Sequence, residues 1–158
     1  MAVNWDAIGA VGEIVGAGAV VVSLVYLAMQ IRTQNNETRF GAMHDISVGY
    51  RDTLATVADG EMATIIDKAI DSYDSLSRVE VLRLIAGVGR IFRVWEEAYL
   101  LYESGRLNDR TWEPMVRQFN GYLDVEPFRR VWELRKRYYD ESFAKYVDSL
   151  SREPYLFE

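Results

Sequence analysis

The chain has 158 residues, a formal net charge of −6 and no cysteine. Its length fits one domain, and its acidic balance argues against nucleic acid as a partner, because phosphate binding needs a concentrated basic surface. The lack of cysteine excludes disulfides and thiolate metal sites and suits a reducing cytoplasmic location.

Residues 7–31 form an almost uninterrupted apolar run with one acidic residue, Glu13. A helix over this run is roughly 37 Å long, enough to cross a hydrocarbon core of about 30 Å. A secretory signal begins with basic residues and has a shorter apolar region, whereas no Lys or Arg precedes Arg32 here. The run therefore predicts a membrane-spanning helix in residues 1–36. Basic residues follow the span, which favours a C-terminal side in the cytoplasm.

Small residues recur at steps of three and four along this helix and predict a packing face bordered by Glu13. The face consists of Gly9, Gly12, Gly16, Ala19 and Ser23. Gly12 and Gly16 form a GxxxG pair, which lets two helix backbones approach closely in lipid. Either Glu13 meets a donor from a second copy or from a larger membrane protein, or its carboxylate reaches toward the membrane surface and the helix is a plain anchor.

The same segment carries a resemblance to known proteins. The pattern N-W-x-A-I-G-A-x-G-E-I-V-G-A over residues 4–17, followed by Y-L-A-x-Q-I-R over residues 26–32, resembles the start of a family of small uncharacterised bacterial proteins. Farther along the chain the match thins to residues 105–107, Trp132 and Phe143. The resemblance implies a bacterial origin and one N-terminal apolar helix before a compact helical region. It implies no activity and no catalytic residue.

The next part of the chain is also helical in pattern. Residues 33–37 are polar and either continue the first helix or break it. Apolar residues at steps of three and four predict an amphipathic helix over residues 40–57, which ends near Asp59. A short helix is expected over residues 61–70, followed by residues typical of a turn.

The strongest helix of the remaining chain begins at a capping box formed by Ser77 and Glu80. Ser104 and Gly105 are expected to end it, because glycine readily adopts the left-handed conformation that follows many helices. Apolar residues cover most of its circumference. A helix of this kind belongs at the centre of a bundle.

Two further helices complete the predicted fold. Asn108 or Asp109 is expected to cap the first of them, and Pro127 suits the first turn of one long final helix. Its apolar seam runs from Phe128 to Leu150. No strand pattern is present, so the predicted fold class is all-α: a transmembrane-like N-terminal helix, then a bundle of four to five helices in residues 37–158.

The sequence contains no recognisable catalytic constellation. His44 is the only histidine, so neither a His-rich metal site nor a di-iron Glu-x-x-His pair can be built. Gly87 and Gly89 lie inside a helical pattern and are expected to allow close helix packing, not to cradle phosphate. We therefore predict no catalytic residue, no metal and no cofactor.

One polar pair is expected in the core. Glu96 lies beside the aromatic stripe of the central helix, and Arg135 interrupts the seam of the final helix. Because an unpaired buried charge is strongly destabilising, Glu96 and Arg135 are predicted to form a buried ion pair that fixes helix register. Arg93, one turn before Glu96, is the other candidate partner. A polar pocket around Glu96, Tyr99 and Arg135 is the functional alternative.

Residues 129–137 hold the main basic cluster, with five basic residues and one acidic residue. Pairing within the helix is expected, with contact to anionic lipid headgroups as the alternative.

The sequence leaves two candidate functions for the chain. The first is a single-span protein of the bacterial inner membrane, with membrane lipid as its surroundings, that acts as an accessory or interaction module. The second is a soluble all-α enzyme or ligand binder whose central core helix is the apolar one.

Overall fold

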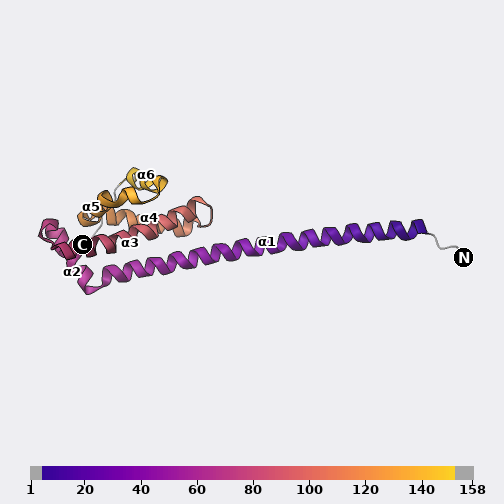
Figure 1. Ribbon diagram of the computed structural model, residues 1–158, viewed down its shortest axis with the longest axis horizontal. Coiled ribbons are helices and arrows are strands. Elements are labelled where there is room, and N and C mark those ends of the chain that lie inside the picture. The colour runs from indigo at the N-terminus through magenta and orange to yellow at the C-terminus, as the bar shows by residue number, and fades with distance from the viewer. Residues whose placement is uncertain (1–4, 152–158) are drawn as a thin grey trace. The chain divides into compact units, whose positions relative to one another are not determined.

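A computed structural model of the chain describes residues 5–151, with side chains for residue 9 and residues 12–151. Within residues 5–151 the fold is all-α with six helices and no strand, which confirms the predicted class. The helices are α1 (Trp5–Ala58), α2 (Gly60–Ser72), α3 (Arg78–Glu103), α4 (Asp109–Asp124), α5 (Glu126–Arg135) and α6 (Glu141–Ser149) (Figure 1). Short 3₁₀ turns precede α3 and α6: η1 (Tyr73–Ser75) and η2 (Lys136–Tyr138).

The chain divides into two compact units, residues 1–40 and residues 41–158. Helix α1 continues through the polar residues 33–37, so these residues extend the first helix and do not break it. Directly after them, the Thr38 hydroxyl donates to the Gln34 carbonyl oxygen at 2.9 Å, so this hydrogen bond lies within the helix. The last part of α1, from residue 41, belongs to the second unit.

The ends of α1 and α2 follow from local side-chain chemistry. α1 ends at Ala58, and Asp59 has an extended backbone with φ −61° and ψ 128°. The Asp59 carboxylate accepts the N–H groups of Glu61 at 3.1 Å and Met62 at 3.2 Å. These donors have no partner inside α2, so the cap satisfies them. The predicted end near Asp59 is confirmed.

Both predicted boundaries of α3 are confirmed. At its start, the Ser77 hydroxyl accepts the Glu80 N–H at 3.3 Å and the Glu80 carboxylate accepts the Ser77 N–H at 2.6 Å. At its end, Gly105 adopts a φ of +67°, which only glycine reaches without strain. The Arg106 N–H then donates to the Leu101 carbonyl at 2.9 Å and closes the last turn.

Helix α3 is the centre of the second unit and packs against α2, α4, α5 and α6. Its Phe92 and Trp95 side chains are completely buried. Close packing also uses the predicted small residue, since a Cβ atom added to Gly87 would lie 2.7 Å from Met62 Cε. The core residues run from Ile46 in α1 to Val147 in α6, so the second unit holds a hydrophobic core of its own.

The prediction of one long final helix is wrong. α5 ends at Arg135, the turn η2 follows, and α6 starts at Glu141 after the N-cap Asp140. The Asp140 carboxylate accepts the N–H groups of Ser142 at 2.9 Å and Phe143 at 3.1 Å. This cap competes with helix continuation, as Asp does at helix starts. The apolar seam remains continuous in the core although the backbone turns.

Candidate functional site

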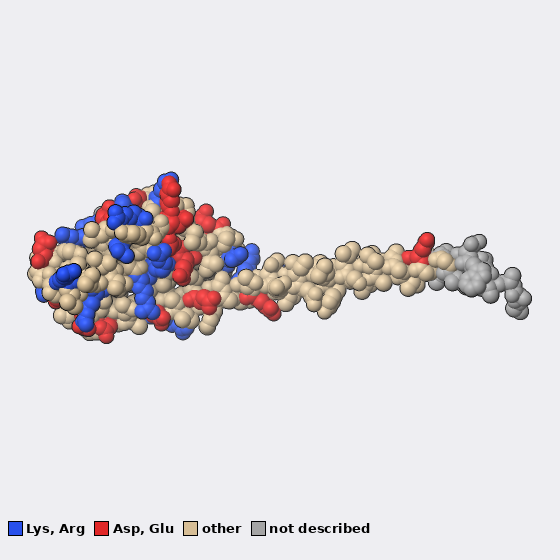
Figure 2. All heavy atoms as spheres, viewed as in Figure 1, with Lys and Arg blue, Asp and Glu red and all other residues tan. Residues whose placement is uncertain are grey.

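The most unusual surface of the protein is the apolar part of α1. Residues 14–31 contain no Asp, Glu, Lys or Arg, and the candidate membrane window in α1 has none of its residues buried. Figure 2 shows this stretch as a long tan surface with very little red or blue. Its large apolar side chains are 51–72% exposed: Ile14, Val15, Val20, Val21, Val22, Leu24, Val25, Tyr26, Leu27, Met29 and Ile31.

The predicted packing face lies within this helix and is open. A Cβ atom added to Gly9, Gly12 or Gly16 would meet nothing within 4 Å. The Ser23 hydroxyl donates to the Ala19 carbonyl oxygen at 2.8 Å, so its hydrogen-bonding capacity is used inside the helix. Glu13 is exposed. The face and the donor expected for Glu13 stay predictions.

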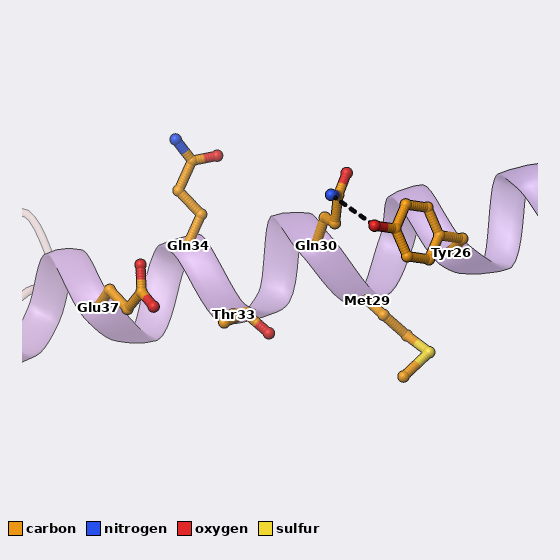
Figure 3. Close-up of a pocket in the computed structure, with 6 residues that line it drawn as sticks. All are labelled: Tyr26, Met29, Gln30, Thr33, Gln34 and Glu37. Carbon is orange, nitrogen blue, oxygen red and sulfur yellow. Dashed lines mark hydrogen bonds between the residues drawn. The ribbon is translucent and has the colours of Figure 1, made fainter.

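Polar and aromatic side chains occupy the end of the apolar stretch (Figure 3). A hollow there is lined by Tyr26, Met29, Gln30, Thr33, Gln34 and Glu37. All six come from α1, so the hollow is an open helix surface and not an enclosed cavity. Gln30 Nε2 donates to the Tyr26 hydroxyl at 3.1 Å. Tyrosine next to amides and charges is the composition found where a membrane helix leaves the hydrocarbon.

Glu96 is buried, as expected, with 6% of its surface exposed. One carboxylate oxygen pairs with the Arg93 guanidinium. The other accepts the backbone N–H of Asp140 at 2.5 Å, across from α3 to the corner that precedes α6. Both oxygens of the carboxylate therefore have donors, which offsets the cost of burying its charge.

The aromatic ring of Tyr139 completes this site. The Arg93 guanidinium carbon lies 4.5 Å from the centre of the Tyr139 ring, and the Tyr139 hydroxyl donates to the Gly89 carbonyl at 3.1 Å. Burial raises the pKa of the Tyr139 phenol above its ordinary value, and the positive charge of Arg93 opposes that rise. The arrangement fixes the corner between α5 and α6 to α3.

The expected pairing of Glu96 with Arg135 is corrected by these contacts, because the partner of Glu96 is Arg93. Arg135 is exposed, and its guanidinium carbon lies 4.6 Å from the centre of the Tyr138 ring. Arg135 is the last residue of α5, and the chain turns at η2 directly after it, so the helical seam does not continue past this position.

A second polar cluster was missed by the sequence analysis. Asp148 of α6 accepts the Trp132 indole N–H at 2.8 Å and a Lys136 ammonium N–H at 2.9 Å. Glu133 lies 3.0 Å from the same ammonium group. Hydrogen bonds to Asp148 and then Glu133 raise the pKa of Lys136. A small cavity of about 190 Å³ lies beside these residues. No local motif predicts the cluster, since Asp148 is 16 residues from Trp132.

The only histidine lies at the edge of a larger hollow. This hollow of about 480 Å³ lies between α1 and α4 and is lined by His44, Ile46, Ser47, Tyr50, Arg51, Thr111 and Met115. His44 itself is exposed. In the part of the chain that the structure describes, no group of three His, Asp or Glu side chains is placed to hold a metal ion.

Comparison with known protein families, with characterised proteins and with solved structures finds no match. The resemblance of residues 4–32 to a bacterial family stays a prediction. The exposed apolar helix and the surface of the bundle are the features of the chain that bear on its function.

Proposed function

We propose that the protein is a single-span, membrane-anchored helical protein that acts as an accessory or interaction module. Its apolar helix lies in the bacterial inner membrane, and residues 41–158 form a bundle on the cytoplasmic side. The exposed, uncharged surface of α1 over residues 14–31 carries the proposal.

The length of this surface suits a bilayer. A helix over residues 14–31 is about 27 Å long, close to a hydrocarbon core of about 30 Å. Exposure of so much apolar area to water is unfavourable by roughly 25 cal/mol per Å². A surrounding bilayer removes this free-energy cost, because lipid chains cover the apolar side chains and no soluble partner has to cover them. The first basic residues, Arg32 and Arg39, follow the stretch and support the cytoplasmic side for the bundle.

The soluble alternative needs other helices to cover the apolar side chains. Within the described residues the apolar window is not buried, which favours the membrane over a core position. The two functions differ in a simple property. A membrane anchor needs detergent for extraction, whereas a soluble bundle stays in the supernatant without it.

Fractionation of cells that express the full chain tests the proposal. We expect the protein in the membrane pellet after an alkaline carbonate wash and its release by mild detergent. A variant with Val20→Asp and Leu24→Asp should move to the soluble or aggregated fraction, because acidic residues at the centre of a span oppose insertion. Val79→Asp and Leu82→Asp, on exposed residues of α3, serve as the matched control and should remain in the pellet.

A monodisperse full chain in the detergent-free supernatant would contradict the proposal and favour the soluble alternative. A pull-down from native membranes in mild detergent then addresses the interaction role. Recovery of the protein alone, with no copy of itself and no second membrane protein, would leave an anchor without a partner and contradict that part of the proposal.

A further inference from the structure

The basic cluster of residues 129–137 separates in the structure into paired and unpaired charges. Arg130 pairs with Asp74 at 3.3 Å, and Lys136 lies between Glu133 and Asp148. These side chains contribute to the fold. Among the described residues, by contrast, neither Arg135 nor Arg137 forms an ion pair with a carboxylate.

The acidic residues nearby have donors of their own. The Glu141 carboxylate pairs with Lys145 at 2.6 Å, and the Asp140 carboxylate caps α6. Glu133 and Asp148 share the ammonium group of Lys136. Arg129, at the other end of α5, also forms no ion pair in the described residues, but it donates to the Asp124 carbonyl oxygen at 3.5 Å. Arg135 and Arg137 are therefore the two guanidinium groups without a carboxylate partner at the C-terminal end of α5, on a chain whose net charge is −6.

Both guanidinium groups form cation–π contacts with one exposed aromatic ring, that of Tyr138. The guanidinium carbons of Arg135 and Arg137 lie 4.6 Å and 4.8 Å from the centre of the Tyr138 ring. Arg137 Nη2 also donates to the Tyr138 hydroxyl at 2.7 Å. Tyr138 is 52% exposed and Leu134, one turn earlier, is 51% exposed. We call Leu134, Arg135, Arg137 and Tyr138 the α5 corner patch.

This combination matches the chemistry of an anionic lipid surface. Guanidinium groups form charge-assisted hydrogen bonds with phosphate. Tyrosine is stable at the headgroup level, where its ring is in apolar surroundings and its hydroxyl in water. A leucine beside them adds apolar area that enters the boundary of the acyl chains. Surface arginines that serve only solubility need neither the exposed tyrosine nor the exposed leucine.

We propose that the α5 corner patch docks the bundle onto the anionic headgroups of the membrane in which α1 is anchored. This inference rests on the proposed membrane anchor, and it adds a second, charge-dependent contact. The anchor fixes which membrane the protein occupies, and the patch restricts the orientation of the bundle at its surface. Docking of this kind weakens as salt rises, because the surface potential falls off within a Debye length.

The absence of cysteine allows a direct test on the full chain. Leu134→Cys is labelled with an environment-sensitive dye, and the protein is reconstituted into vesicles of phosphatidylcholine or of phosphatidylcholine with phosphatidylglycerol. We expect a blue shift, and quenching by a headgroup-proximal lipid quencher, only in the vesicles that contain phosphatidylglycerol. High salt should reverse both signals.

Charge variants distinguish an effect of the α5 corner patch from an effect of the protein's total charge. Each basic residue near an anionic surface contributes roughly fivefold, so Arg135→Gln with Arg137→Gln should weaken docking by roughly 25-fold. Arg110→Gln with Arg117→Gln changes the net charge equally on exposed residues of α4 and should leave docking unchanged. Equal loss in both double variants would overturn the proposal, because it would show a response to total charge.

A second label distinguishes the failure of this inference from failure of the anchor. Leu24→Cys with the same dye should report a hydrocarbon environment in both kinds of vesicle. An aqueous signal from position 24 would overturn the membrane anchor and the docking together. A hydrocarbon signal at position 24 with an aqueous signal at position 134 in both kinds of vesicle would overturn the docking alone.

Discussion

Glu96 is the residue that joins the centre of the bundle to its last corner. Its carboxylate pairs with Arg93, whose side chain is half exposed, and accepts the Asp140 N–H at 2.5 Å. The exposure of Arg93 determines how much stability is lost when Glu96 is removed. Removal of Glu96 does not leave a fully buried cation, since the Arg93 side chain is 50% exposed and reaches water. The main loss is the acceptor for a partly buried backbone N–H.

We therefore predict that Glu96→Ala lowers the free energy of unfolding by about 1 kcal/mol, the low end of the cost of an unsatisfied buried donor, because the Asp140 N–H is only partly buried. Urea unfolding of the full chain in detergent, followed by tryptophan fluorescence, measures this loss. Glu97→Ala, at an exposed neighbour, is the matched control and should change stability by less than about 0.5 kcal/mol. An unchanged unfolding curve for Glu96→Ala would contradict the assigned role.

Arg135 gives the complementary test. Because it is exposed and contacts the Tyr138 ring, Arg135→Ala should also change stability by less than about 0.5 kcal/mol. A loss as large as that of Glu96→Ala would mean that the two side chains pair after all.

At the scale of the helices, the N-terminus of α3 is closed by a capping box of Ser77 and Glu80. Hydrogen bonds from Ser77, and then from Lys68, lower the pKa of Glu80 from 4.5 to about 2. A carboxylate whose pKa is lower in the folded state stabilises the fold above its unfolded pKa. The stabilisation is lost as the pH falls from about 4.5 toward 2.

The prediction is that Glu80→Gln is less stable than the parent at neutral pH, and that this difference shrinks below a pH of about 4.5. Thermal midpoints measured across the acid range would reveal it. In a Ser77→Ala background the pH-dependent part of the difference should be smaller, because the Ser77 hydroxyl, the largest cause of the lowered pKa of Glu80, is gone, while the backbone N–H of residue 77 remains. A difference that stays constant with pH would contradict this account of the cap.

The apolar part of α1 supplies a prediction about association. Helices in lipid associate through close packing and polar contacts, since lipid provides no hydrophobic drive. Added side chains at Gly12 and Gly16 meet nothing within the chain itself. Replacement of both by Leu should therefore leave insertion intact and weaken contacts between copies or with another membrane protein.

Disulfide crosslinking through Ser23→Cys in native membranes measures this effect, because the chain has no other cysteine. Gly18→Leu is the matched control, since position 18 lies on another side of the helix and is equally open. Unchanged crosslinked bands in the Gly12 and Gly16 double variant would exclude the packing face and leave a passive anchor.

On the scale of the whole molecule, the two units differ in how far their apolar side chains are buried. The buried core extends from Ile46 to Val147 and lies entirely in residues 41–158. The exposed apolar surface of residues 14–31 contributes nothing to that core. The bundle therefore should not depend on the apolar helix for its folding.

We predict that residues 41–158 alone are soluble without detergent and unfold in one cooperative transition, because a complete core supports two-state behaviour. Tryptophan fluorescence and far-UV circular dichroism should report the same urea midpoint. Aggregation of this piece would show that residues before position 41 contribute to the bundle, and two separate transitions would show that the bundle is not one cooperative unit.

The sequence by itself determined the helical class, the apolar helix and most helix boundaries. These features depend on periodicity and on contacts within a few residues, such as those of Asp59, of Ser77 with Glu80 and of Gly105. Such contacts join residues that are close in the sequence, so they can be predicted without knowledge of the tertiary structure.

Only the tertiary structure decided the partner of Glu96, the break after α5 and the Asp148 cluster. The Glu96 carboxylate and the Asp140 N–H are 44 residues apart, and Trp132 and Asp148 are 16 residues apart. The presence of Asp140 in the sequence does not by itself predict the break, because the apolar spacing of the seam also fits one continuous helix. The buried carboxylate on α3 favours the turn, because it accepts an N–H that a continuous helix would bond within itself.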